Sequence, residues 1–271
     1  HCGHCLACVE GRPGNCDDGQ KANGAGEILG GGQRMTLGGE RVYHHLGVSA
    51  FATHTVAHRN SLVKITADVS FAEAALFGCA VLTGVGAVVN TARVPAGAKV
   101  AVVGLGGVGF NALLGARLTG ASEVHAVDLL DDKLALAREL GATSAWRADT
   151  PDLIGQLKVD YAFEMAGSTR ALELAYRLVR RGGTVVTAGL PHPDDRWPLQ
   201  AVNLVAEEKT VKGSYMGSCL PQRDIPRFLD LYQRGQLPVA RLMSSRIKLE
   251  DINEGFEKLA AGSVVRQIIE F

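Results

Sequence analysis

Hydrophobic and polar positions follow two different rhythms along the chain, and the change comes at Lys99. Beyond it, short β-branched apolar runs alternate with stretches of helical periodicity. The expected strands are Lys99–Val103, Glu123–Val127, Tyr161–Phe163 and Gly183–Ala188, and the expected helices end at Leu118 or cover Asp131–Leu140 and Thr169–Val179. Buried strands separated by helices predict a parallel sheet covered on both faces.

The segment before Lys99 has a weaker pattern. Residues 1–45 are rich in Gly, Asn and Asp with little periodicity, which predicts a loop held by something other than a core. Short alternating runs at Phe51–Thr53 and Leu62–Ile65 predict strands at the edge of a β-rich unit. Phe71–Val89 is Ala-rich and predicts a helix that glycines interrupt.

After Val211 the chain returns to mixed structure. Asp224 can cap a helix that Gly235 ends, and Ile252 lies in a second helix that Gly262 ends. The last residues, 267–271, predict a final strand.

Composition excludes several classes of function. The chain has 271 residues, 46% of them hydrophobic, and its 28 basic and 28 acidic residues cancel, so charge does not favour nucleic acid or a charged membrane as a partner. No apolar stretch approaches the roughly 20 residues that span a bilayer, and no signal peptide is visible. We expect a cytoplasmic protein with reduced cysteines.

A glycine-rich loop follows the first strand of the alternating region. Gly104, Gly106 and Gly109 form G-x-G-x-x-G, with Gly107 and Val108 inside it. The pattern alone is weak, but here it directly follows a predicted strand and opens a predicted helix. The first glycine allows the tight turn, the second lets backbone approach a pyrophosphate, and the third lets the helix pack on its strand. The loop predicts a dinucleotide site.

Asp128 ends the second predicted strand, nineteen residues after Gly109. A carboxylate there can accept hydrogen bonds from ribose hydroxyls and would repel a 2′-phosphate, which favours NAD over NADP. Leu129 and Leu130 follow Asp128, so they offer no arginine to neutralise a 2′-phosphate. The alternative is that Asp128 caps the next helix, a role that Asp131 could fill instead.

Four of the six cysteines lie in the first sixteen residues. Cys2, Cys5, Cys8 and Cys16 have the spacing C-x2-C-x2-C-x7-C, typical of a closed, structural zinc site. An iron–sulfur cluster is an alternative, but a ferredoxin run would need a cysteine where Arg12 stands before Pro13. Disulfides are the second alternative, and the absence of a secretion signal argues against them.

The order of these features resembles the zinc-containing medium-chain alcohol dehydrogenases. A four-cysteine loop precedes an isolated Cys79, then Thr83-Gly84-Val85-Gly86-Ala87, then the glycine fingerprint. Gly47–Phe51, Lys212-Gly213-Ser214 and the ending around Arg266 extend the likeness over essentially the whole chain. The resemblance implies an α/β fold: a doubly wound Rossmann domain plus a GroES-like β-rich catalytic domain, here incomplete. The implied domains are residues 1–80 (partial catalytic domain with the structural-zinc loop), 81–217 (NAD-binding) and 218–271 (return to the catalytic domain).

The resemblance also implies roles for single residues. Cys79 would be a ligand of a catalytic zinc that activates the alcohol oxygen. Thr83 and Val108 would pack against the nicotinamide, Lys133 would hold the adenosine ribose, and Arg266 would contact the pyrophosphate. The substrate would be a primary or secondary alcohol or an aldehyde, and the family suggests a homodimer or homotetramer. On its own, Cys79 could be a buried core thiol and Arg266 a surface residue.

The sequence departs from the family at the catalytic zinc. The family's other zinc ligands, a cysteine and a histidine followed by glutamate, lie upstream of the structural-zinc loop, and this chain opens at that loop. None of the eight histidines falls at a family ligand or proton-relay position, and we expect each on the surface or in a loop. We therefore expect an N-terminally truncated copy. Four functions remain: an NAD-dependent alcohol dehydrogenase, a thiol-adduct formaldehyde dehydrogenase, a zinc- and NAD-binding module without turnover, or iron–sulfur electron transfer.

Overall fold

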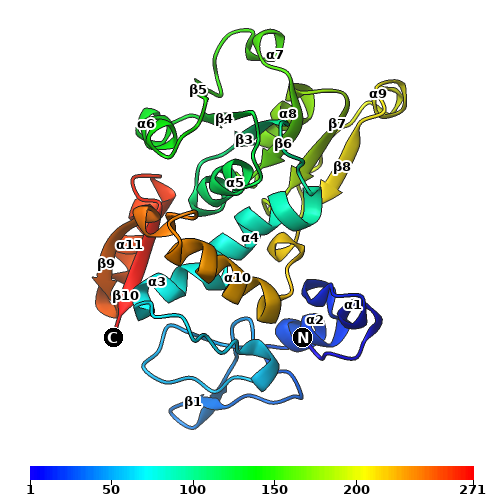
Figure 1. The fold of residues 1–271 in the computed structure, drawn as a ribbon. Helices are drawn as coiled ribbons and strands as arrows, with labels where there is room; N and C mark the ends of the chain where they lie inside the picture. Colours follow the sequence, from blue (N-terminus) through cyan, green and yellow to red (C-terminus); the bar gives the residue numbers. More distant parts are fainter.

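The computed structural model describes residues 1–271, and its largest element is a six-stranded parallel sheet (Figure 1). Its strands are β3 (Lys99–Val103), β4 (Glu123–Asp128), β5 (Ser144–Arg147), β6 (Val159–Glu164), β7 (Val179–Thr187) and β8 (Thr210–Gly213). They lie in the order β5-β4-β3-β6-β7-β8, so the chain reverses its direction of travel across the sheet after β5. In such sheets a ligand binds at the carboxyl ends of the strands, where the order reverses.

Helices cover both faces of this sheet. The α-helices are α1 (Leu6–Val9), α2 (Asp17–Gly24), α3 (Phe71–Ala75), α4 (Ala80–Gly86), α5 (Gly107–Leu118), α6 (Asp131–Glu139), α7 (Leu153–Gln156), α8 (Thr169–Leu178), α9 (Ala201–Ala206), α10 (Pro221–Gln233) and α11 (Ile252–Ala260). Shorter turns of 3₁₀-helix are η1 (Pro13–Asn15), η2 (Arg59–Ser61), η3 (Leu76–Gly78), η5 (Met216–Ser218), η6 (Val239–Leu242) and η7 (Leu249–Asp251), and η4 (Ala87–Ala92) is a π-helix. No single helix is long and apolar enough to cross a membrane.

Strand β3 shows why both faces are buried. Its side chains point alternately to opposite faces. Val100 and Val102 belong to the core that α4, α5, α6 and α10 form on one face. Ala101 and Val103 belong to a second core with α7 and α8. A strand buried on both faces must be apolar at every position, and β3 is apolar after Lys99.

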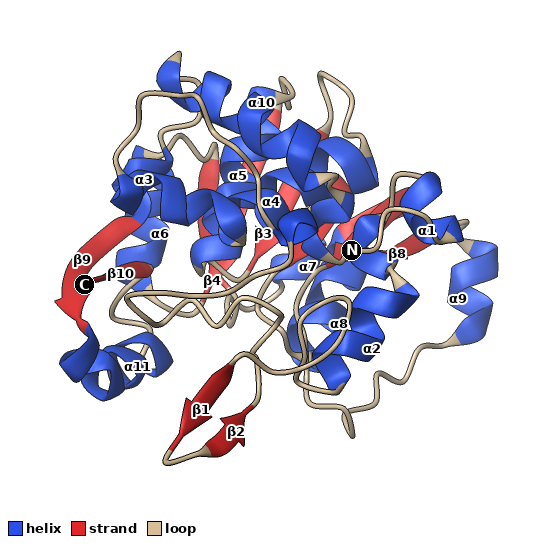
Figure 2. Ribbon diagram, turned by 90° about the horizontal axis from the view of Figure 1, so that it is seen from below, coloured by secondary structure: helices blue, strands red, loops and turns tan.

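The remaining strands form two small sheets away from the main one (Figure 2). β1 (Met35–Leu37) pairs antiparallel with β2 (Glu40–Val42), and β9 (Met243–Lys248) pairs parallel with β10 (Arg266–Glu270). In Figure 1 the first 70 residues lie below the sheet, and the C-terminal pair lies beside α11.

The strand–helix alternation after Lys99 is confirmed, including the final strand, and the doubly wound parallel sheet is the expected one. The strands predicted at Phe51–Thr53 and Leu62–Ile65 are wrong, because no strand of this chain pairs with either run. The helix predicted over Phe71–Val89 is divided into α3, η3, α4 and η4.

Asp224 does not begin its helix as predicted. Helix α10 begins at Pro221, and Asp224 lies in its first turn, where its carboxylate accepts a hydrogen bond from the Leu220 N–H at 2.9 Å. The helix starts earlier than predicted because Pro221 stands at its first position, which proline favours. Asp224 still caps the helix, but it does so from within the first turn.

Candidate cofactor and metal sites

The glycine loop joins β3 to α5 in a tight turn. Gly104 has a φ of 92°, a left-handed conformation that glycine adopts without strain. A Cβ on Gly109 would lie 1.8 Å from the Gly104 carbonyl oxygen, so only glycine allows this turn to close. A Cβ on Gly106 would meet nothing within 4 Å. The loop is therefore closed toward the protein at Gly109 and open toward solvent at Gly106.

Arg266 lies against this loop although 157 positions separate it from Gly109. A Cβ on Gly107 would lie 2.0 Å from Arg266 Nε, so the guanidinium occupies the space beside the first residue of α5. Arg266 Nε is buried and has no hydrogen-bond partner in the protein. The N–H groups of the first helical turn also lack intrahelical partners. An arginine whose Nε is buried without a partner and a helix N-terminus together form a site that fits a phosphate.

The structure places Asp128 at the carboxyl end of β4, beside the loop. Its Oδ2 accepts a hydrogen bond from the Leu105 N–H at 2.6 Å, and its Oδ1 accepts one from the Leu130 N–H at 3.0 Å. These bonds hold the carboxylate in place and leave acceptor positions free, because a carboxylate has about four. Asp131 makes no side-chain cap to α6, whose N-cap residue is Leu130. Asp128 therefore links the loop to the start of α6 and can still accept from a ligand.

Lys133 projects from α6 toward the C-terminal segment. Its Nζ lies 3.4 Å from the position that a Cβ on Gly262 would take. Lys133, Leu130 and Gly262 line a cavity of about 600 Å³ between α6 and residues 261–265. This volume is within the range of small-ligand sites, so Lys133 borders a space that a ligand could enter.

Thr83 lies in α4 and Val108 in α5, two helices that pack against each other. A Cβ on Gly84 would lie 2.3 Å from the Val108 carbonyl oxygen, so this glycine lets α4 approach α5. Thr83 is buried, and its Oγ1 contacts Met216 Sδ at 3.9 Å. The structure thus brings both predicted nicotinamide contacts to one helix–helix contact beside the loop.

Sequence reasoning missed Glu164, which holds the neighbouring strand end in position. Glu164 is 1% exposed, and its carboxylate accepts hydrogen bonds from the N–H groups of Ala166 at 2.8 Å and Gly167 at 2.6 Å. It also accepts one from Thr187 Oγ1 at 2.6 Å. These bonds fix the carboxyl ends of β6 and β7, and Ala166 packs on Gly104. An acidic residue ending a buried strand just before a glycine was the available signal.

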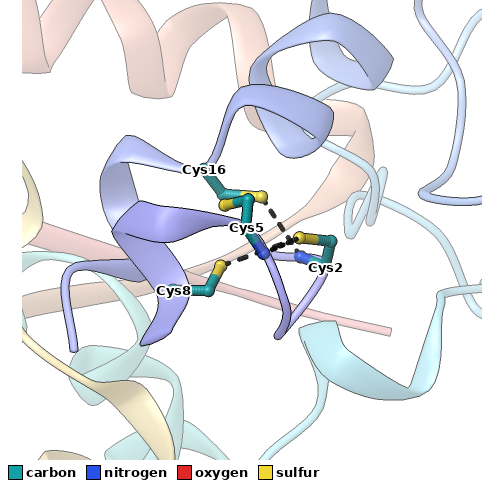
Figure 3. Close-up of side chains that lie close together, drawn as sticks. All are labelled: Cys2, Cys5, Cys8 and Cys16. Atoms are coloured by element: carbon teal, nitrogen blue, oxygen red, sulfur yellow. Dashed lines mark hydrogen bonds between the residues drawn. The ribbon is translucent and has the colours of Figure 1, made fainter. Parts of the chain in front are cut away.

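The four N-terminal cysteines converge on one point (Figure 3). The four sulfur atoms of Cys2, Cys5, Cys8 and Cys16 all lie within 4.8 Å of one another. Cys2 Sγ and Cys8 Sγ are 3.9 Å apart. Four thiolates at about 2.3 Å from a tetrahedral zinc lie about 3.8 Å from one another. The donor set and its spacing therefore fit zinc.

Backbone N–H groups donate to these sulfur atoms. The N–H of Cys2 donates to Cys16 Sγ at 3.1 Å, and the N–H of Gly19 donates to the same sulfur at 3.3 Å. Burial raises the pKa of Cys16, but these two N–H groups outweigh it and lower the pKa to about 7. Burial raises the pKa of Cys8 to about 12. The sulfur atoms of the cluster therefore differ in acidity, and zinc binding must displace the protons of those that are thiols.

The geometry disfavours both alternatives to zinc. All six cysteines are free thiols, and the Cys2–Cys8 separation is far longer than a disulfide bond of about 2.05 Å. A cluster of several irons would hold its thiolates farther apart than a single ion does. A second group, Cys2 with His4 and Asp18, lies beside the first, but His4 and Asp18 are exposed.

Cys79 stands apart from any such cluster. It is exposed at the junction of η3 and α4, and no group of three candidate ligands includes it. The residues of this chain therefore do not by themselves form a catalytic zinc site. The expectation that every histidine is a surface or loop residue is wrong for His125, which is buried in β4 between Ser144 and Glu123. His44 is in a loop but is also buried.

Comparison with known proteins places these sites in a family. Residues 107–234 match a family described as "Zinc-binding dehydrogenase". Alcohol dehydrogenase 1 of Pisum sativum is 31% identical over 99% of this chain and 73% of its own length. S-(hydroxymethyl)glutathione dehydrogenase of Paracoccus denitrificans is 31% identical over 99% of this chain and 75% of its own.

Solved structures agree. An alcohol dehydrogenase zinc-binding domain protein from Burkholderia ambifaria superposes with a TM-score of 0.94 and 30% identity. The superposition covers 100% of this chain and 75% of the Burkholderia chain. Benzyl alcohol dehydrogenase from Acinetobacter calcoaceticus superposes with a TM-score of 0.93 and 29% identity over the same shares of the two chains. The chain belongs to the zinc-containing medium-chain alcohol dehydrogenase family.

Proposed function

We propose that this protein binds NAD at the glycine loop and serves hydride transfer between a primary or secondary alcohol and NAD. The family makes the chain a dehydrogenase, an oxidoreductase. The observation that carries the proposal is the buried, unpartnered Nε of Arg266 beside Gly107, next to the open space at Gly106. A pyrophosphate in that space would satisfy both the arginine and the free N–H groups of α5.

Each residue of the loop has one task in this proposal. Gly106 leaves room for the pyrophosphate, and Arg266 balances its charge. Asp128, already held by two backbone N–H groups, accepts hydrogen bonds from the adenosine ribose. Lys133 borders the same end of the site, and Thr83 and Val108 pack against the nicotinamide. NAD supplies the hydride acceptor when it is bound.

Asp128 also sets the choice of cofactor. Its carboxylate would face the 2′-phosphate of NADP and repel it, and the two residues that follow, Leu129 and Leu130, are uncharged. The hydrogen bonds from the Leu105 and Leu130 N–H groups keep the carboxylate from turning away. NAD is therefore the expected cofactor.

The zinc that fits this chain is structural. Cys2, Cys5, Cys8 and Cys16 would hold it with four thiolates, which leaves no open position for a substrate. Cys79 would be a ligand of a catalytic zinc, but no second or third candidate ligand accompanies it here. We therefore expect these 271 residues alone to bind NAD without oxidising alcohols, so the proposed hydride transfer requires zinc ligands that they do not supply.

Substitution at Gly106 tests the cofactor site. Its φ is −81° and a Cβ there meets no atom within 4 Å, so Gly106→Val should fold normally. The branched side chain would fill the space of the pyrophosphate and abolish NAD binding, measured by calorimetric titration. Gly24→Val is the matched control, because Gly24 also has open space around its Cβ position and ends α2. Unchanged NAD affinity in a folded Gly106→Val protein, or tighter binding of NADP than of NAD by the unmodified protein, would overturn the proposal.

A thiol-adduct formaldehyde dehydrogenase is the second candidate, favoured by the relative from Paracoccus denitrificans. NADH formation with S-(hydroxymethyl)glutathione and none with ethanol or benzyl alcohol would select it. Turnover with the simple alcohols would instead show that Cys79 has ligands that the cluster geometry does not reveal.

A further inference from the structure

A second cavity lies at the edge of the sheet opposite the glycine loop. It has a volume of about 580 Å³ and is lined by the residues that precede or begin β6, β7 and β8, by the end of α8 and by the start of α9. The loop that carries Gly106 lies instead at the carboxyl ends of the strands. The volume is in the range of small-molecule sites, and nothing in the proposed function uses this cavity.

Positive charge dominates the cavity lining. Five cations, Lys158, Arg177, Arg180, Arg181 and Lys209, face only two carboxylates, Glu173 and Glu207. The two carboxylates already have partners: Glu207 pairs with Lys209 at 2.7 Å, and Glu173 accepts from the Trp197 indole N–H at 2.8 Å. The guanidinium groups of Arg177 and Arg181 make no side-chain hydrogen bond or ion pair in the protein.

Two of the cations have a structural task that anchors them. Lys158 Nζ donates to the Arg177 carbonyl at 2.7 Å, and Lys209 Nζ donates to the Tyr176 carbonyl at 3.2 Å. Both lysines thereby satisfy carbonyl groups at the end of α8, where cations are favourable. This role explains the lysines, and Arg180 is bound as well, because its Nε donates to Asp160 Oδ1 at 2.6 Å. The guanidinium groups of Arg177 and Arg181 are therefore the ones left for a ligand.

Tyr176 gives an independent sign of a missing partner. The residue is 4% exposed, its Oη is buried, and that oxygen has no hydrogen-bond partner. A buried hydroxyl without a partner is costly, and such groups are uncommon in folded proteins. Burial raises the pKa of Tyr176, with Glu207 and Glu173 adding to the effect, so the phenol remains a neutral hydrogen-bond donor. A ligand oxygen at the floor of the cavity would accept that hydrogen bond.

We propose that this cavity binds a phosphate-bearing small molecule, held by Arg177 and Arg181 at its rim and by Tyr176 at its floor. Planar guanidinium groups match phosphate oxygens with paired hydrogen bonds. The excess of unpaired cations favours a ligand with at least two negative charges. The site is separate from the NAD site, so both ligands can be bound together.

Inorganic pyrophosphate is the probe that tests this site. It is titrated by calorimetry into the full chain, with and without saturating NAD, at constant ionic strength. The double substitution Arg177→Gln with Arg181→Gln should weaken binding at least tenfold, because each arginine supplies charge-assisted hydrogen bonds. Arg170→Gln is the matched control: it removes one exposed arginine from the other end of α8 and should leave the affinity unchanged.

Tyr176→Phe removes only the hydroxyl and should weaken pyrophosphate binding about two- to tenfold. Thermal melting of each variant verifies the fold. If NAD abolishes pyrophosphate binding, the anion binds at the glycine loop and the proposal is wrong. If the double variant binds pyrophosphate as tightly as the unmodified protein, Arg177 and Arg181 do not hold the anion and the proposal is also wrong. An equal loss in Arg170→Gln would reveal unspecific attraction to surface charge and would overturn it as well.

Discussion

The N-terminal 70 residues and the region around helix α5 are held together by different forces. Only six of the first 70 residues are buried, whereas nine of the twelve residues of α5 are. Apolar burial on two faces of the sheet stabilises the second region. The first region has almost no core, and the cysteine cluster brings four side chains of its first sixteen residues to one point.

The two regions touch at the cysteine loop and near residues 60–69. A Cβ on Gly14 would lie 3.3 Å from the Tyr215 ring, so the cysteine loop rests on the segment that follows β8. From helix α10, Gln222 Nε2 donates to the Asn60 carbonyl and Gln233 Nε2 donates to the Asp68 carbonyl, each at 3.4 Å. Because a segment without a core cannot offset its chain entropy by burial, a bound metal has to supply the stabilisation.

Removal of the metal should therefore have the largest effect, and it should destabilise the N-terminal region without affecting the region around α5. Structural zinc in small peptides contributes about 10–16 kcal/mol, which is folding free energy for such a loop. We expect one firmly bound zinc per chain. Chelation or Cys8→Ser should release it and accelerate amide exchange over residues 1–20, while exchange in α5 stays slow. Metal analysis and hydrogen–deuterium exchange measure the two results.

Cys79→Ser is the matched control for that experiment. Cys79 is exposed and outside the cluster, so this variant should keep its zinc and its exchange pattern. Two tightly bound zinc ions per chain in the unmodified protein would contradict the assignment, and so would a zinc that survives Cys8→Ser.

Truncation of a core side chain should have the next largest effect, and here the sheet region should lose stability while the N-terminal region does not. Phe163 in β6 is 0% exposed, and Phe163→Ala should cost about 3–5 kcal/mol of unfolding free energy. Phe51 in the N-terminal region is 60% exposed, so Phe51→Ala should change stability by less than about 0.5 kcal/mol. Denaturant unfolding measures both. A similar loss in the two variants would mean that the N-terminal region has a core of its own.

The same contrast explains what could be predicted from the sequence. In the sheet region the local sequence of each segment depends on where that segment lies. Strand β3 is apolar at successive positions because both of its faces are buried, and a single tight turn requires Gly104 and Gly109. Local pattern therefore predicted those elements and the dinucleotide loop. The runs at Phe51–Thr53 and Leu62–Ile65 also alternate, but a strand needs a partner, which local alternation does not supply.

Sites assembled from distant segments were the harder part. Only the family resemblance predicted that Arg266 contacts the pyrophosphate, and its position against Gly107 was not predicted, since nothing near Arg266 in the sequence marks it. The cavity proposed to bind phosphate is lined by residues of separate elements, among them Lys158, Arg177 and Lys209. In the sequence each of these is indistinguishable from an ordinary surface charge. Cys2, Cys5, Cys8 and Cys16 were predictable because one short loop carries all four.

A buried carboxylate gives the smallest effect and adds pH to the comparison. Asp224 is 0% exposed, and it bonds to the Leu220 N–H, the Asn90 amide and the Arg223 guanidinium. Burial alone would raise its pKa, but Arg223 and the Leu220 N–H outweigh burial and hold the pKa below its usual value. A lowered folded-state pKa stabilises the protein above the unfolded-state pKa of about 3.9, and this contribution is lost as pH falls through the folded-state pKa. Asp224→Asn should therefore lower the unfolding free energy by about 1.5–3 kcal/mol at pH 7, and the difference from the unmodified protein should shrink below about pH 4.

Glu10→Gln is the N-terminal counterpart: Glu10 pairs with Arg12 on the surface, with the two side chains 43% and 59% exposed, so its loss should cost less than about 1 kcal/mol. Because zinc release at low pH affects all three proteins alike, the differences between their unfolding curves isolate the carboxylates, and a pH-independent difference for Asp224→Asn would show that its charge plays no part.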